Sequence, residues 1–268
     1  MSTLLTLAVH GAGGRMGKRV IAVAAEDRDV ELIAAIEHPD HPAIGQDAGT
    51  QAGVRSLGVT LGGDLPAQVD AVIDFSLPAA ADAIIAACET RRLPLVMATT
   101  GLSEVQQGAL RGAAKSIPIV FAPSMSASVN LTMKLAQQVT RALADVPGGM
   151  DIEIVERHHR FKADAPSGTA LRFGELISQA MNGDVETVHG REGETGTRPQ
   201  NQIGYHAIRV GDDPGQHTII FGMMGEKIEL NVAASNRDGY AAGAIRAAKW
   251  LRGKSPGLYS MFDVLDLQ

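Results

Sequence analysis

The chain has one cysteine, few aromatic residues, no excess of basic residues and no long apolar run. Cys88 stands alone among 268 residues, which excludes an internal disulfide and a cysteine-based zinc cluster. With 4% aromatic residues and 30 acidic against 24 basic side chains, the surface is not that of a nucleic-acid-binding protein. No apolar run approaches the ~20 residues that span a bilayer, and the N-terminus lacks a signal-peptide pattern. We therefore expect a globular cytoplasmic protein without nucleic-acid or membrane partners.

The remaining composition points to enzymes that need no resident metal. Apolar residues make up 45% of the chain, enough for one large domain or two smaller ones. Neighbours such as Ile84 and Ile85 predict that Cys88 is a buried helix residue rather than a catalytic thiol. Five histidines are scattered without metal-ligand spacing and are interpreted as structural: His10, His41, His189, His206 and His217.

The N-terminal half alternates short apolar strands with helices. Repeated βα alternation predicts a Rossmann-like α/β fold, in which a parallel sheet is doubly wound by helices. The expected strands cover 4–10, 31–36, 71–75, 95–97 and 117–121. The expected helices cover 18–25, 79–88 and 104–114.

A glycine loop follows the first strand and opens the first helix. Gly11, Gly14 and Gly17 have a G-x-x-G-x-x-G spacing, and Gly11 and Gly13 would let the backbone approach a diphosphate. Glu37 ends the second strand, where its carboxylate can accept hydrogen bonds from a ribose diol. This context predicts a nicotinamide dinucleotide site. A tight turn that binds nothing is the alternative.

Two further loops lie at the carboxyl ends of expected strands, where such folds bind ligands. They are Ala98-Thr99-Thr100-Gly101 and Ala122-Pro123-Ser124-Met125-Ser126. Their small hydroxyl residues are suited to a nicotinamide or a ribose, although each loop alone could be an ordinary connection.

The pattern changes after Ser126. A long helix over 129–143 leads to a strand over 151–155, and three successive strands over 202–210, 217–221 and 227–233 indicate a mixed, open sheet. We expect a second α+β domain over 127–235, whose flat apolar sheet is covered by helices or by another subunit. Residues 1–126 and 236–268 form the expected dinucleotide-binding domain, because the last helix, 240–251, returns to it.

A basic segment, ERHHRFKADAPSGTALR over 156–172, is unusual in a chain of net charge −6. Ser167-Gly168-Thr169 predicts a capped helix start, where free N–H groups bind anions. Cations and two histidines precede it, so the segment can grip a carboxylate while His158 and Lys162 offer protons. A solvated basic loop is the alternative. Glu156 and Asp164 are expected to be ion-paired, with lowered pKa values, rather than general acids.

Together these motifs resemble the 4-hydroxy-tetrahydrodipicolinate reductase family, also called dihydrodipicolinate reductase. The resemblance rests on VHGAGGRMG, ATTG, ERHHRFKADAPSGTA, HGREGETGTR and WLRGKSPGLYSMFDVLDL, and it extends along essentially the whole chain. It implies reduction of a cyclic dicarboxylate with NADH or NADPH on the route to diaminopimelate and lysine. It also implies a homotetramer assembled through the second-domain sheet.

The resemblance also implies roles for individual residues. His158 looks like the proton donor and Lys162 like a second donor, both on one face if the segment turns helically. His159, Ser167, Gly168 and Thr169 look like substrate contacts. The implied cofactor-binding residues are Gly11, Ala12, Gly13, Gly14, Arg15, Met16, Glu37, His38, Ala98, Thr99, Thr100, Ala122, Pro123, Ser124 and Met125.

The chain departs from the family pattern around the nucleotide. His38 replaces the arginine that often follows the acidic residue and grips a 2′-phosphate, which favours NADH over NADPH. Ser124-Met125 replaces an asparagine-phenylalanine pair, and Ala98 stands where glycine is common. Two other functions stay open at this point: a dehydrogenase of another small dicarboxylate and a non-catalytic nucleotide sensor.

Overall fold

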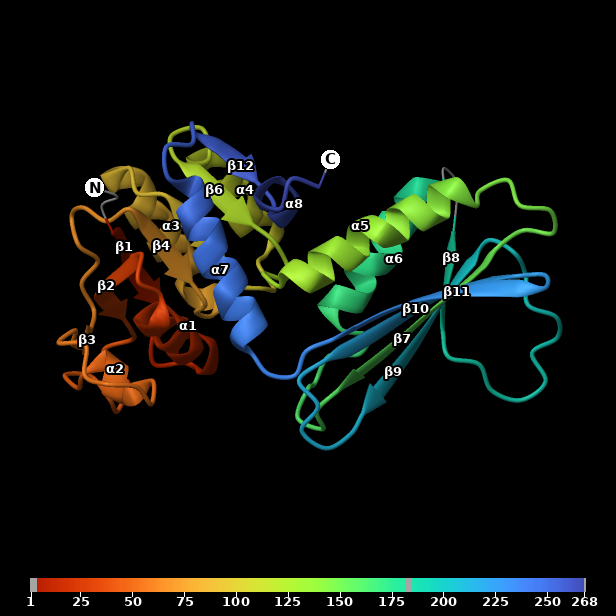
Figure 1. Cartoon of the computed structure of the whole chain (residues 1–268), viewed down its shortest axis with the longest axis horizontal. Helices are drawn as coiled ribbons and strands as arrows, with labels where there is room; N and C mark the ends of the chain where they lie inside the picture. The colour runs from red at the N-terminus through yellow and green to blue at the C-terminus, as the bar shows by residue number, and fades with distance from the viewer. Residues whose placement is uncertain (1–3, 182–184, 268) are drawn as a thin grey trace. The chain divides into compact units, whose positions relative to one another are not determined.

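The computed structural model describes residues 4–181 and 185–267, which divide into two compact units (Figure 1). The first unit runs up to Ala127 and resumes at Arg237, and the second unit is Ser128–Asn236. The chain thus leaves the first unit once and returns to it with its last helix.

The first unit is built on a seven-stranded parallel sheet. Its strand order is β12-β6-β5-β4-β1-β2-β3, and the order reverses direction between β1 and β4. The strands are β1 (Leu5–His10), β2 (Val30–Ile36), β3 (Leu61–Gly62), β4 (Ala71–Asp74), β5 (Leu95–Met97), β6 (Pro118–Phe121) and β12 (Gly257–Tyr259). The helices are α1 (Arg15–Glu26), α2 (Ala48–Gln51), α3 (Pro78–Arg91), α4 (Glu104–Ala113), α7 (Asp238–Leu251) and α8 (Met261–Val264).

Helices cover both faces of this sheet. Val9 of β1 packs in one apolar cluster with Ile21 of α1 and Ile245 of α7. Its neighbour Ala8 packs in a second cluster, with Ile84 of α3. Strand side chains alternate between the two clusters, as burial on both faces of a parallel sheet requires. The predicted doubly wound fold is confirmed, and helix α7 packs in the first of these clusters.

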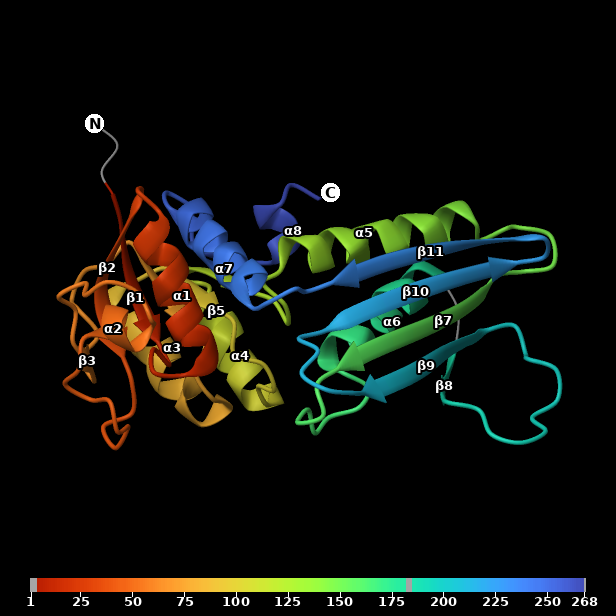
Figure 2. The ribbon, with the colours of Figure 1, turned by 60° about the horizontal axis from the view of Figure 1, so that its bottom comes forward.

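The second unit holds a mixed five-stranded sheet of order β11-β10-β7-β9-β8. Strand β7 runs parallel to β9 and antiparallel to β10. The strands are β7 (Asp151–His158), β8 (Glu186–His189), β9 (Gln202–Arg209), β10 (Gln216–Met223) and β11 (Glu226–Ala233). The helices are α5 (Ala127–Ala142) and α6 (Gly168–Met181), and both lie on one face of the sheet (Figures 1 and 2).

The alternation along β7 decides which side chains meet the helices. Ile152 and Ile154 are fully buried beneath them, together with Phe173 of α6. Glu156 and His158 continue this helix-facing series, whereas Glu153 belongs to the opposite, outer face. Helix α6 packs closely: a Cβ added at Gly174 would lie 1.7 Å from the Tyr205 hydroxyl.

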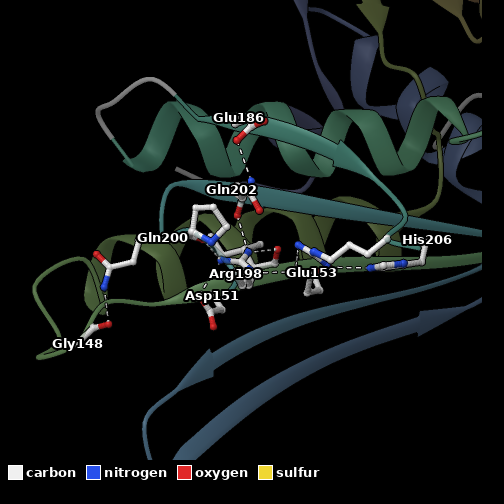
Figure 3. Close-up of polar contacts among 11 residues, drawn as sticks. Gly148, Asp151, Glu153, Glu186, Arg198, Gln200, Gln202 and His206 are labelled. Atoms are coloured by element: carbon white, nitrogen blue, oxygen red, sulfur yellow. Dashed lines mark hydrogen bonds and ion pairs between the residues drawn. The ribbon is translucent and has the colours of Figure 1, made fainter. Parts of the chain in front are cut away.

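The outer face carries a polar network centred on Glu153, which we call the outer-face network (Figure 3). Its carboxylate accepts two hydrogen bonds from Arg191, one from Arg198 at 2.9 Å and one from His206 at 2.7 Å. Arg198 also donates to the carbonyls of Ile152 and Gln202. The network fastens the long connection between β8 and β9 to β7.

Candidate active site

The glycine loop forms a close turn at the end of β1. Gly11 has a φ of +74°, which favours glycine, and a Cβ there would lie 2.7 Å from the Phe75 carbonyl oxygen. A Cβ at Gly17 would lie 2.1 Å from the Gly11 oxygen, so this glycine lets α1 pack against the loop as predicted. The first N–H groups of α1 have no acceptor within the helix and face an anion site.

A cavity of about 820 Å³ opens beside this loop. Six residues predicted to bind the cofactor line it: Gly11, Gly14, Arg15, Met16, Glu37 and His38. The lining residues that the sequence did not single out for binding are His10, Ile36, Pro39, His41, Gly63, Phe75, Ser76, Leu77, Ala79 and Ala80. His10 and His41, interpreted from the sequence as structural histidines, therefore line this cavity.

Glu37 and the histidines near it shape one end of the cavity. One Glu37 oxygen accepts a hydrogen bond from the Gly13 N–H at 2.8 Å, and the other accepts from the His38 N–H at 2.9 Å. The His41 ring lies so close that a Cβ at Gly13 would be 2.7 Å from it. The His38 side chain is 72% exposed. Gly13 thus makes room for a carboxylate and an imidazole in this structure.

The two downstream loops, residues 98–101 and 122–126, differ from the glycine loop because most of their predicted binding residues are buried. The side chains of Ala98, Ala122 and Met125 are buried in the core. Thr99 is buried and its hydroxyl donates to Asp74 at 2.7 Å. Ser124 is buried as well, while Thr100 and Pro123 are exposed. None of these loop residues is among those that line the cavity of 820 Å³ in the described chain.

In the second unit, the basic segment is organised by Glu156. This residue is buried at the end of β7, and its carboxylate accepts a hydrogen bond from His158 Nδ1 at 2.5 Å. Arg209 donates to both carboxylate oxygens at 2.8 Å, and the Ser167 N–H donates to one at 3.0 Å. These partners hold the pKa of Glu156 below its usual value although burial acts in the opposite sense. Glu156 is therefore an ion-paired anchor, as predicted, and we call this group the inner-face network.

His158 stands at the edge of that network. Its ring is 8% exposed and meets the His217 ring edge-on, with 5.3 Å between centroids. Burial lowers the pKa of His158, while the Glu156 carboxylate acts to raise it. The Glu156 bond fixes Nδ1 as the protonated nitrogen and directs Nε2 away from the anchor. When the ring is doubly protonated, a histidine held in this way can donate a proton through Nε2.

The remaining predicted substrate residues surround the start of α6. The Ser167 hydroxyl accepts from the Ala170 N–H at 3.2 Å, which confirms the predicted cap and leaves the Gly168 and Thr169 N–H groups at the helix start. Lys162 is paired with Asp164 at 2.9 Å. His159 Nδ1 is buried without a hydrogen-bond partner in the described chain.

Two expectations about this segment are wrong in detail. His158 and Lys162 do not share a helix face, because β7 extends to His158 and a turn follows it. The cations of the segment are also less free than expected, because Arg157 pairs with Asp213 and Arg172 pairs with Glu175. The sequence interpretation also missed Arg209 and the contact of His217.

Three further features of residues 4–181 and 185–267 concern the thiol, metal ligation and the helices. Cys88 is buried, and burial raises the pKa of its thiol to about 12, which rules out a reactive thiolate. No group of three or more histidine, cysteine and carboxylate side chains is arranged to hold a metal ion in these ranges. Among the helices described there, none has the length and apolar character needed to cross a bilayer.

Sequence comparisons cover both units. The profile "Dihydrodipicolinate reductase, N-terminus" matches residues 5–125, and the profile "Dihydrodipicolinate reductase, C-terminus" matches residues 128–265. The chain belongs to the dihydrodipicolinate reductase family.

Relatives and a solved structure agree with membership of the dihydrodipicolinate reductase family. A Rhodopirellula baltica protein named 4-hydroxy-tetrahydrodipicolinate reductase is 58% identical over 98% of this chain and 96% of its own length. The Alkalilimnicola ehrlichii protein of the same name is 48% identical over 97% and 98%, respectively. A dipicolinate-bound dihydrodipicolinate reductase from Paenisporosarcina sp. TG-14 has a TM-score of 0.76 and 21% identity, with 97% of this chain and 99% of that chain covered. At that identity the likeness shows the fold.

Proposed function

We propose that this chain catalyses the NAD(P)H-dependent reduction of 4-hydroxy-tetrahydrodipicolinate to tetrahydrodipicolinate, a step on the route to diaminopimelate and lysine. A hydride and a proton are added and the 4-hydroxyl group leaves as water. Family membership and the name of the relatives support the reaction. The observation that carries the proposal is the inner-face network, which presents His158 beside an anion-binding helix start. A non-catalytic sensor would have no use for an oriented proton donor.

The nucleotide fits the first unit. The Gly11 turn leaves no room for a Cβ, the start of α1 offers N–H groups to a diphosphate, and Glu37 stands where a ribose diol is bound. Gly11, Gly14, Arg15, Met16 and Glu37 would hold the nucleotide. The reduced nicotinamide supplies the hydride when it is bound.

The second unit supplies binding and the proton. A carboxylate of the cyclic substrate would be bound by the Gly168 and Thr169 N–H groups and by Lys162, which would exchange Asp164 for the substrate. His159 would donate to the substrate through a ring nitrogen. His158, held by Glu156, would deliver the proton that the reduced substrate requires, with Lys162 as a second donor.

The deciding experiment measures loss of reduced-nicotinamide absorbance with substrate freshly generated from pyruvate and aspartate semialdehyde. The wild type should oxidise the nucleotide, and His158→Ala should lose about 10²- to 10⁴-fold in kcat, the range typical of general acid catalysis. The matched control is His189→Ala, an exposed histidine of the same unit, which should keep its rate. Nucleotide binding without oxidation by the wild type would refute this substrate.

His38 is the basis for a cofactor preference. Its side chain is exposed, and its Nδ1 accepts a hydrogen bond from the Asp40 N–H at 3.3 Å. An imidazole lacks the planar, bidentate guanidinium with which arginine binds a 2′-phosphate. We expect kcat/KM at pH 8 to be higher for NADH, and His38→Arg to raise kcat/KM for NADPH by about tenfold. Equal values for the two nucleotides in the wild type at pH 8 would refute the preference.

The outer face of the second-unit sheet is the proposed assembly surface of a homotetramer. Helices α5 and α6 cover one face (Figure 2), whereas Ile208 and Val210 remain exposed on the other. Such a face favours burial against further copies of the chain. Sedimentation of the purified protein should give four times the chain mass, and a monomer would refute the assembly.

A further inference from the structure

Asp74 is a carboxylate buried at the end of β4 in the first unit. Its exposure is 0%, and the strand residues before it, Val72 and Ile73, are also fully buried. A carboxylate in such surroundings is costly unless hydrogen bonds compensate. Asp74 has three donors: His10 Nδ1 at 2.6 Å, the Thr99 hydroxyl at 2.7 Å and the Ser76 N–H at 3.3 Å.

These partners come from the carboxyl ends of adjacent strands. His10 ends β1 and pairs in register with Asp74 of β4, and Thr99 follows β5, whose Met97 pairs with Asp74. The strand order reverses between β1 and β4. Ligands of open α/β sheets bind in the crevice at such a reversal. The buried group thus lies where a bound dinucleotide crosses the sheet.

The His10 ring connects this buried group to the cavity. Its Nδ1 is held by Asp74, and the residue lines the cavity of 820 Å³ next to Gly11 and Phe75. Its side chain is 15% exposed, and Nε2 has no hydrogen-bond partner among the described residues. Apolar residues at both positions would fill this part of the core at less electrostatic cost. The pair is therefore better explained by what Nε2 contacts in the cavity.

We propose that His10 is a nucleotide-binding residue, positioned by Asp74 and Thr99, whose Nε2 accepts a hydrogen bond from a nicotinamide-ribose hydroxyl of NAD(P)H or, when the ring is doubly protonated, donates one to the diphosphate. The inference rests on the proposed function, which requires that nucleotide. Glu37 and His38 follow β2, on one side of the glycine loop, and mark the adenosine end. His10 lies toward β4, on the other side, and so faces the nicotinamide half.

Two substitutions at His10 separate the role of Nδ1, which bonds Asp74, from the role of Nε2, which faces the cavity. His10→Asn keeps an amide near the Nδ1 position and can still bond Asp74, but it removes the group that faces the cavity. His10→Gln places an amide near the Nε2 position. Dissociation constants are measured calorimetrically for NADH, for ADP-ribose and for AMP, which lacks the second phosphate and second ribose.

The Asn variant should bind NADH and ADP-ribose about tenfold or more weakly, the effect of losing one hydrogen bond to a charged or strongly polar group. AMP binding should stay within twofold, and His10→Gln should recover part of the lost affinity. Equal ADP-ribose affinity in the wild type and the Asn variant overturns the inference while leaving the proposed function intact. Absence of NADH binding in the wild type overturns both.

A measurement on the wild type makes the test independent of variant folding. With ¹⁵N-labelled histidine, the Nε2 resonance of His10 should shift on addition of ADP-ribose and stay unchanged with AMP. An unchanged Nε2 resonance at saturating ADP-ribose would overturn the inference. The Asn variant serves to assign the resonance, since the His10 signal is missing from its spectrum.

Discussion

Glu153 and Glu156 lie three residues apart on β7, and each is held by arginine and histidine on opposite faces of the sheet. Glu153 bonds Arg191, Arg198 and His206, and burial of its side chain is incomplete at 20% exposure. Glu156 bonds Arg209, His158 and the Ser167 N–H, and its side chain is 1% exposed. The same set of groups therefore occurs twice on one strand.

The difference lies in what each network holds in place. Around Glu153, two arginines of the β8–β9 connection converge, so the carboxylate fastens a long loop (Figure 3). Around Glu156, the partners are a strand arginine, a helix start and a histidine at the edge of the site. A carboxylate–arginine pair is thus no sign of catalysis by itself. The position of the histidine at the site distinguishes the inner-face network.

The largest expected effect comes from replacing the central glutamate of each network in turn. Glu156→Gln should lower kcat by about 10²-fold, because an amide cannot stabilise a protonated His158 and leaves Arg209 without its counter-ion. Glu153→Gln should change kcat by less than about twofold. Steady-state kinetics at a temperature where both variants are folded checks this. Similar losses in the two variants would mean that the networks are not functionally distinct.

The outer-face network should contribute to stability in a way that depends on pH. Its hydrogen bonds lower the pKa of Glu153 from 4.5 to about 2 against the effect of burial. A lowered carboxyl pKa stabilises the fold above the unfolded value, and this stability is lost as the pH falls from 4.5 toward 2. Glu153→Gln should therefore cost about 1–3 kcal/mol of unfolding free energy at pH 7 and progressively less below pH 4.5.

Urea unfolding at one protein concentration, at pH 7.0, 4.5 and 3.0, measures that difference. The matched control is Glu175→Gln, which removes an exposed ion pair with Arg172 and should cost less than about 0.5 kcal/mol. If the loss of unfolding free energy in Glu153→Gln stayed constant from pH 7.0 to 3.0, the lowered pKa of Glu153 would not be its cause.

Much of this fold follows from local sequence signals. The buried strands of the first unit are continuous apolar runs. The glycine loop requires small residues at Gly11 and Gly17 for steric reasons. Both features could therefore be predicted from the sequence. The capped start of α6 likewise depends on Ser167 alone. Very short strands such as β3 and β12 escaped prediction because two or three residues carry no periodicity.

The polar networks could not be predicted because strand register creates them. Arg209 lies 53 residues after Glu156 in the sequence, and the contact between them depends on the pairing of β9 with β7. His217 reaches His158 through β10 in the same way. His10 reads as an ordinary strand end until Asp74, 64 residues later, lies beside it. Spacing along the sequence contains no trace of such contacts.

The smallest expected effect concerns His217, which contacts His158 beside the inner-face network. His217 packs between Phe173 and His158, its Nδ1 has no partner in the described chain, and burial lowers its pKa to about 4. A histidine whose folded pKa lies below the unfolded value of 6.5 favours the fold above pH 6.5, and this contribution is lost as the pH falls through about 4.

Replacing the buried imidazole should remove that acid sensitivity. His217→Phe should unfold within about 1 kcal/mol of the wild type at pH 7 and gain about 1–2 kcal/mol relative to it between pH 6.5 and 4. Urea unfolding across this range measures the gain, with His189→Phe as control because His189 is exposed and stacks on Tyr205. Parallel pH profiles for the wild type and His217→Phe would show that His217 titrates normally, and the inner face would then be wetter than its burial indicates.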